Sequence, residues 1–208
     1  KKAVFLQNNW KIMLITTPAI VLNFQRRGDQ SCVVHAYTRE YGRVNYMVYG
    51  VGRKNPIGCY NPLSLVQLTI SSSTKTLPSV RTANLIFIPS TIYTNAYKQT
   101  IALFLSEILF NTLRHPMPDE TLFDYIEHSI RLLDSESDTQ DFHLQFLIDF
   151  ASLFGFATDK NTHPELLIKP ISRQERQAQL RHICAYLAQY IDNWQDPRSL
   201  DVLIEVFN

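Results

Sequence analysis

Residues 17–54 read TPAIVLNFQRRGDQSCVVHAYTREYGRVNYMVYGVGRK, and their apolar residues recur mostly at every second position. This period is typical of half-buried β-strands. Polar segments containing glycine interrupt the pattern at residues 26–29 and 39–42, where we expect tight turns, and a loop is expected at residues 53–58. The pattern therefore predicts consecutive antiparallel strands joined by hairpins.

The alternating pattern continues from Thr16 to Ile88. Five short strands are expected, at residues 17–24, 31–38, 42–49, 63–70 and 79–87. This number suits a five-stranded Greek-key barrel of the OB type, a fold whose open face and loops commonly bind single-stranded nucleic acid. An SH3-like barrel would give a similar sequence pattern.

From Asn95 onward the apolar residues recur with the period of a helix. Thr94 or Asn95 can cap the first helix, and the prolines at 116 and 118 end it. Helices are expected at residues 96–112, 121–133, 139–154, 173–191 and 199–207. The sequence thus predicts an α+β protein with an N-terminal extension at 1–12, an OB-fold domain at 13–93 and an all-helical domain at 94–208.

The charges of the two predicted domains differ sharply. Residues 1–93 contain eleven Lys and Arg against two Asp and Glu, whereas residues 94–208 contain nine against seventeen, so the near-neutral whole joins a basic half to an acidic half. A basic surface attracts polyanions such as nucleic acid. The charge distribution therefore points to the first domain as the part that binds a polyanion.

The basic residues of the first domain lie mainly in or beside its expected turns. The candidates for phosphate contacts are Arg26, Arg27, Arg39, Arg43, Arg53 and Lys54. Tyr41, Tyr46 and Tyr49 lie between them and are candidates for stacking on unpaired bases. The alternative is that the charges are solvated or protect edge strands, and that most of the tyrosines pack inside the barrel.

Motifs of catalysis and of metal binding are missing from the sequence. There is no Gly-rich phosphate loop, no G-x-S-x-G and no H-x-x-x-H pair. The three cysteines are far apart and fit neither a disulfide framework nor a zinc site, so we expect them to be packing residues in a reducing cytoplasm. We expect no catalytic residue, no cofactor and no metal. No apolar run reaches the roughly 18 residues that span a bilayer, so no membrane association is expected either.

One predicted helix of the acidic half begins with basic residues. Arg173, Arg176 and Arg181 lie in the first part of the helix expected at 173–191. An acidic peptide tail could dock there, although a solvated basic face gives the same pattern. Four acidic residues lie close together at Asp134, Glu136, Asp138 and Asp141. We interpret them as part of a solvated loop between helices rather than as a metal site.

Several strings of the sequence resemble the RecO recombination-mediator family, particularly members from Bacteroides-like bacteria. In the barrel they are MLITTPAIVL (13–22), TREYGR (38–43), VYGVGRK (48–54) and PLSL (62–65). In the helical half they are EIL (107–109), LFDYI (122–126), FHL (142–144), LFGF (153–156) and SLDVLIEVF (199–207). Their order and spacing cover nearly the whole chain after residue 12.

This resemblance implies an OB-fold domain followed by a helical domain, with binding to single- and double-stranded DNA. It also implies annealing of complementary strands, and cooperation with RecR to load RecA onto DNA coated by single-stranded DNA-binding protein (SSB). DNA contacts of the family map onto Arg43, Arg53 and Lys54, and the family's docking site for the acidic SSB tail lies on the helical domain. A cytoplasmic, nucleoid-associated protein is expected.

The sequence departs from the family pattern at several positions. Asn45 and the neighbourhood of Tyr49 lack basic residues that relatives carry, and Leu144 and Gln145 stand where some relatives have arginines. Residues 157–172 lack the four-cysteine zinc module of many relatives, so zinc is not expected. The function expected from the residues and the resemblance together is that of a DNA repair mediator. The alternative is a non-catalytic scaffold whose barrel binds an acidic protein.

Overall fold

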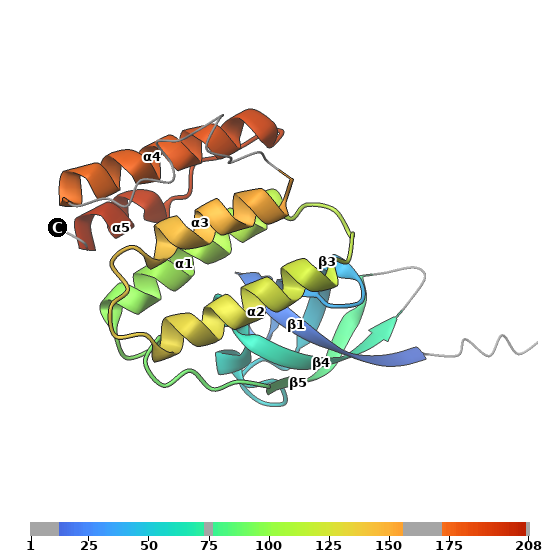
Figure 1. Cartoon of the computed structure of the whole chain (residues 1–208). Coiled ribbons are helices and arrows are strands. Elements are labelled where there is room, and N and C mark those ends of the chain that lie inside the picture. The colour runs from blue at the N-terminus through green and yellow to red at the C-terminus, as the bar shows by residue number, and fades with distance from the viewer. Residues whose placement is uncertain (1–12, 73–76, 156–171, 207–208) are drawn as a thin grey trace, which may run out of the picture.

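The barrel and the helices form separate layers of the molecule. The computed structural model describes residues 13–72, 77–155 and 172–206. Figure 1 shows the helices stacked on one side of the strands, with α2 beside the barrel and α4 and α5 farthest from it. The expected N-terminal extension at 1–12 lies outside the described residues.

The first domain is a closed five-stranded barrel with the strand order β1-β2-β3-β5-β4. Its strands are β1 (Met13–Arg26), β2 (Ser31–Thr38), β3 (Gly42–Tyr49), β4 (Leu65–Ser72) and β5 (Ser79–Leu85), with a short 3-10 helix η1 (Ile57–Tyr60) after β3. All strand pairs are antiparallel except β3 with β5. The predicted OB-type barrel is confirmed.

Strand β1 is longer than predicted because it has two partners. Its first part, from Met13 to Ile20, pairs with β4, and its second part, from Ala19 to Arg26, pairs with β2. The two pairings overlap at Ala19 and Ile20, and the pairing with β2 has a register shift between Val21 and Asn23, where a bulge bends the strand. A single long strand therefore belongs to both sides of the barrel and helps to close it.

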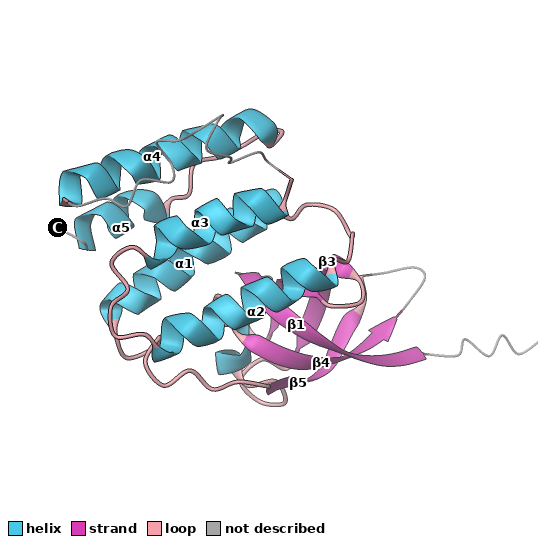
Figure 2. Cartoon of the chain, in the orientation of Figure 1, coloured by secondary structure: helices cyan, strands magenta, loops and turns pink. Residues whose placement is uncertain are grey.

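The helical domain contains five helices within the described residues (Figure 2). They are α1 (Ala96–Thr112), α2 (Glu120–Ser135), α3 (Phe142–Leu153), α4 (Arg173–Tyr190) and α5 (Ser199–Val206). Asn95 caps α1, Asp119 caps α2, and Ser172 forms a capping box with Glu175 at the start of α4. The predicted helices are confirmed, with ends that differ by up to three residues.

The barrel has its own hydrophobic core, and a second hydrophobic cluster joins it to the helices. Along β1, Ala19 and Val21 point into the barrel core, whereas Ile20 and Leu22 belong to the cluster built mainly by the helices. Tyr37 of β2 joins the same cluster and stacks on Phe123 of α2 at 6.2 Å. Burial on both faces fixes this part of the barrel against the helices, so the domains are docked rather than merely tethered.

Asp134 anchors the segment that connects the two domains. Its carboxylate accepts hydrogen bonds from the backbone N–H groups of Ser90, Thr91 and Ile92, at 3.0, 2.8 and 2.9 Å. The buried Lys98 ammonium donates to the backbone oxygen of Asp134 at 2.7 Å. The prediction of a solvated loop was wrong for Asp134, because Asp134 is buried and its side chain supplies acceptors for the backbone N–H groups of the connecting segment.

Candidate nucleic-acid interface

Two loops of the barrel meet at one end and present basic side chains there. The backbone N–H groups of Gly50 and Val51, which follow β3, donate to the carbonyl of Gln30 in the β1–β2 turn at 2.8 and 3.2 Å. The pairing of Ser31 with Tyr49 places the two loops side by side. Residues of both loops line a small hollow of about 150 Å³. The exposed side chains of these loops therefore share one surface.

We call this surface the exposed end and define it by Arg26, Arg27, Tyr49, Arg53 and Lys54, all of which are exposed. Among the described residues, none of its four basic side chains forms an ion pair. Asp29 contributes one exposed carboxylate to the same turn. The exposed end therefore carries a net positive charge that is open to a ligand.

A tightly hydrogen-bonded turn holds Arg53 and Lys54 outward. The carbonyl of Gly50 accepts from the backbone N–H groups of Arg53 and Lys54, at 3.1 and 2.9 Å. The side-chain amide of the buried Asn55 donates to the carbonyl of Tyr49 at 2.9 Å. Gly50 has a φ of +70°, a conformation that a residue with a Cβ adopts only with strain. The basic pair is thus displayed on a fixed backbone.

The three tyrosines considered for base stacking have different environments. Tyr49 is 60% exposed and lies at the exposed end, and Tyr41 is 39% exposed in the β2–β3 turn at the other end of these strands. Tyr46 is 1% exposed inside the barrel core. The prediction for Tyr46 was wrong, because Tyr46 shares the inward face of β3 with Val44 and Val48.

The helical domain neutralises Arg39. Its guanidinium forms an ion pair with Asp124 and lies 3.6 Å from the Glu127 carboxylate, both on α2. It also lies over the Phe123 ring, 4.5 Å from the centroid. The hydrogen bond with Asp124 raises the pKa of Arg39. The structure therefore contradicts the prediction of a free phosphate-binding Arg39.

Arg43 also turns toward the helical domain. Its Nη1 donates to the carbonyls of Phe110 and Leu113, at 2.9 and 2.8 Å, and its guanidinium lies 4.3 Å from the Phe110 ring centroid. These carbonyls belong to the C-terminal end of α1, where helix carbonyls lack intrahelical partners. Burial, together with the charge of Arg114, lowers the pKa of Arg43 to about 10. Arg43 therefore does not belong to the exposed end, although the sequence placed it with Arg53 and Lys54 among the candidates for phosphate contacts.

A hollow of about 530 Å³ lies beside Arg43, between the barrel and the helices. We call it the interdomain hollow; it is lined by Arg43, Asn45, Phe110, Asn111, Arg114, Pro116, Asn193 and Gln195. Arg114 was not among the residues expected to bind DNA. No local signal identifies it, because the hollow is completed by residues of the barrel and of the segment after α4, which are far away in the sequence.

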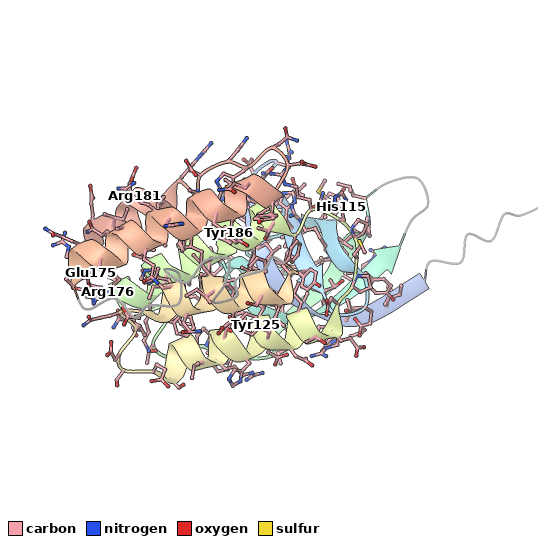
Figure 3. All side chains as sticks on the ribbon, turned by 45° about the horizontal axis from the view of Figure 1, so that its top comes forward. His115, Tyr125, Glu175, Arg176, Arg181 and Tyr186 are labelled. Atoms are coloured by element: carbon pink, nitrogen blue, oxygen red, sulfur yellow. The ribbon has the colours of Figure 1, made fainter. Side chains whose placement is uncertain are left out.

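The three arginines considered for an acidic tail are not equivalent. Arg176 is tied to the start of α3, since its Nε donates to Asp141 and its Nη2 to Gln140, at 2.9 and 2.8 Å. Arg173 is exposed, and Arg181 is exposed with its guanidinium 4.0 Å from Asp201. Figure 3 shows Arg176 at one end of α4 and Arg181 farther along the helix. The structure thus leaves Arg173 and Arg181 as the more accessible members.

The described residues contain neither a candidate metal site nor a candidate membrane span. Within residues 13–72, 77–155 and 172–206, no group of three His, Cys, Asp or Glu side chains is placed to hold a metal ion. Nearly all of the segment that corresponds to the relatives' zinc module lies outside the described residues. The three cysteines are free and buried, as expected for packing residues. In the described part of the chain, no helix is both long enough and apolar enough to span a bilayer.

Comparisons with known proteins agree with this architecture. Residues 13–89 match the family model "Recombination protein O N terminal", and residues 94–163 match "Recombination protein O C terminal". The boundary between the matches coincides with the segment that joins the barrel to α1.

Curated relatives carry the name DNA repair protein RecO. The protein from Flavobacterium johnsoniae is 27% identical, covering 94% of this chain and 100% of its own. The one from Phocaeicola vulgatus is 33% identical, with 74% and 66% covered, and the one from Bacteroides fragilis is 26% identical, with 94% and 100% covered. Together with the barrel and the helical domain, these matches show that the chain belongs to the RecO family of DNA repair proteins.

Proposed function

We propose that this protein is a non-enzymatic mediator that holds the phosphate backbones of single- and double-stranded DNA at the exposed end of its barrel. The observation that carries the proposal is the hydrogen-bonded pair of loops with four exposed basic residues, none of them in an ion pair among the described residues. Phosphate contacts give affinity without sequence preference. Tyr49 adds a ring on which an unpaired base can stack.

The helical domain would supply the protein contacts of the same mediator. In this proposal it docks the acidic SSB tail at basic positions such as Arg173 and Arg181, and the protein acts with RecR to load RecA onto SSB-coated DNA. Screening the repulsion between two bound strands would also favour their annealing. Support comes from family membership and from the separation of a basic barrel surface from an acidic helical domain.

The salt dependence of binding tests the proposal. Each phosphate contact to a single strand contributes roughly 0.7 to the log–log salt slope, so Arg53→Ala with Lys54→Ala should flatten the slope by about 1.4. Fluorescence titration of an oligonucleotide at several salt concentrations measures it. The matched control is Arg53→Lys with Lys54→Arg, which keeps both charges and should keep the slope.

Two results would count against the proposal. An unchanged slope in the alanine variant would show that the exposed end does not contact phosphates. Absence of salt-dependent affinity for oligonucleotides of unrelated sequence would favour the alternative in which the barrel binds an acidic protein. Adding the SSB tail peptide to the same titration would show whether the tail and DNA share a site or bind separately.

A further inference from the structure

The interdomain hollow combines two guanidinium groups with neutral polar groups. Its eight lining residues include Arg43 and Arg114, three asparagines and one glutamine, but no carboxylate. Its volume of about 530 Å³ lies in the range of ligand sites. The composition of the walls therefore suits an anion rather than a cation.

The two arginines are held in place without being neutralised. Arg43 is fixed by the carbonyls at the end of α1, and Arg114 donates from Nε to Asn111 and from Nη2 to Asn193, at 2.7 and 2.9 Å. All of these acceptors are uncharged backbone oxygens. Among the described residues, no carboxylate pairs with either arginine, and burial, followed by repulsion from Arg114, lowers the pKa of Arg43. A bound anion would relieve this repulsion.

The outer face of β3 connects the interdomain hollow to the exposed end. Side chains alternate along a strand, so Arg43, Asn45, Met47 and Tyr49 share the outer face, whereas Val44, Tyr46 and Val48 face the barrel core. Arg43 and Asn45 line the hollow, and Tyr49 belongs to the exposed end. At ~3.3 Å per residue the face is about 20 Å long.

The outer face of β3 carries no negative charge. Neither β2 nor β3 contains an Asp or Glu, so no carboxylate of these strands interrupts the way from the exposed end to the hollow. One strand of a duplex carries a phosphate every ~3.4 Å along the helix axis, so a strand that advances about 20 Å along that axis carries about six phosphates. An extended polyanion can therefore reach both basic sites at once, which a single carboxylate cannot do.

We propose that the interdomain hollow is a second phosphate site, in which Arg43 and Arg114 hold the backbone of a strand that runs along β3 from the exposed end. The proposal rests on the DNA-binding function proposed above and adds Arg114 of the helical domain to the binding surface. Because the hollow is built by both domains, a strand that fills it also contacts both domains.

The test compares short and long oligonucleotides, of about 4 and about 16 nucleotides, which bracket the site sizes of OB folds. Arg114→Gln should lower the salt slope by roughly 0.7 for the long oligonucleotide and leave the short one unchanged, since the short one is held at the exposed end. Arg114→Lys keeps the charge and should keep the slope. Arg43 is left intact because its loss would free the carbonyls at the end of α1.

The outcomes separate this proposal from the proposed function. If Arg53→Ala with Lys54→Ala lowers the slope for both lengths while Arg114→Gln changes neither, the second site is refuted and the exposed end stands. If Arg114→Gln lowers the salt slope equally for both oligonucleotide lengths, the hollow is not the far end of the path, and the proposal is overturned. It is also overturned if Arg114→Gln weakens only the binding of an acidic peptide, because the hollow is then a protein site. Matching thermal unfolding of the variants excludes misfolding.

Discussion

Basic residues lie at both ends of the β2–β3 region, but they are exposed at one end and bound to the helical domain at the other. At the exposed end, Arg53 and Lys54 point into solvent from a fixed turn. At the other end, Arg39 is paired with carboxylates of α2, and Arg43 binds carbonyls of α1. The comparison shows that the helical domain pairs Arg39 with carboxylates and fixes Arg43 beside the interdomain hollow, whereas Arg53 and Lys54 stay exposed. Net charge alone does not reveal this division.

The largest expected effect comes from separating the start of β3 from the helical domain. Gly42 has a φ of +62°, and a Cβ there would lie 2.5 Å from the backbone of Met117. Gly42→Ala should therefore lower the free energy of unfolding by about 3 kcal/mol or more, through strain plus a clash. Urea denaturation measures the change.

Gly155→Ala is the control for this substitution. Gly155 has a φ of +84°, and among the described residues no atom lies within 4 Å of the added Cβ, so the strain of about 1 kcal/mol is isolated from the clash. Equal losses in the two variants would contradict close docking at Gly42.

A smaller loss is expected from weakening the connection between the domains. Asp134→Asn keeps the shape but replaces one acceptor oxygen by a donor, and should cost about 2 kcal/mol in unfolding free energy. Because the exposed end lies elsewhere, the salt slope of DNA binding should be unchanged. A slope that falls together with stability would show that the two ends are not separate.

The pH dependence of stability sharpens this prediction. Burial raises the pKa of Asp134, but hydrogen bonds from the backbone of Ile92, Thr91 and Ser90 outweigh it and lower the pKa to about 2. The carboxylate therefore stabilises the fold fully above pH ~4, and this contribution is lost as the pH falls toward 2. The difference in stability between the wild type and Asp134→Asn should shrink over this range. A constant difference would refute the lowered pKa.

A still smaller effect is expected from the ring at the exposed end. Tyr49→Ala should weaken binding of single-stranded DNA by about 1 kcal/mol, or about fivefold, through loss of base stacking. Tyr49→Phe keeps the ring and should bind normally. Equal weakening toward single-stranded and duplex DNA in a titration would argue against stacking, because duplex bases are already stacked.

The sequence pattern predicted the elements well because their causes are local. Alternation of apolar residues located the strands, and the helical period with its caps located the helices. The length of β1 was missed because pairing with two neighbours leaves no local mark. The position of Tyr46 could have been predicted, since Val44 and Val48 have the same parity in a strand whose core face is apolar.

The candidate site was predicted less completely, because groups far away in the sequence bind some of the basic residues and so determine which of them stay exposed. Arg39 meets Asp124 from 85 residues away, and Arg43 meets carbonyls 67 and 70 residues away. Backbone carbonyls at a helix end have no residue-type signature, so the pattern of side chains in the sequence could not predict the contacts of Arg43. Arg114 was missed for the same reason.

The most direct test compares the salt slopes of two single variants, Arg53→Ala and Arg39→Ala, on the same single-stranded oligonucleotide. Both lose one arginine from the barrel, but only Arg53 is free of carboxylate partners among the described residues. We predict that Arg53→Ala flattens the slope by roughly 0.7 and that Arg39→Ala leaves it unchanged. Equal slopes in the two variants, or a larger change for Arg39→Ala, would contradict the assignment of DNA binding to the exposed end.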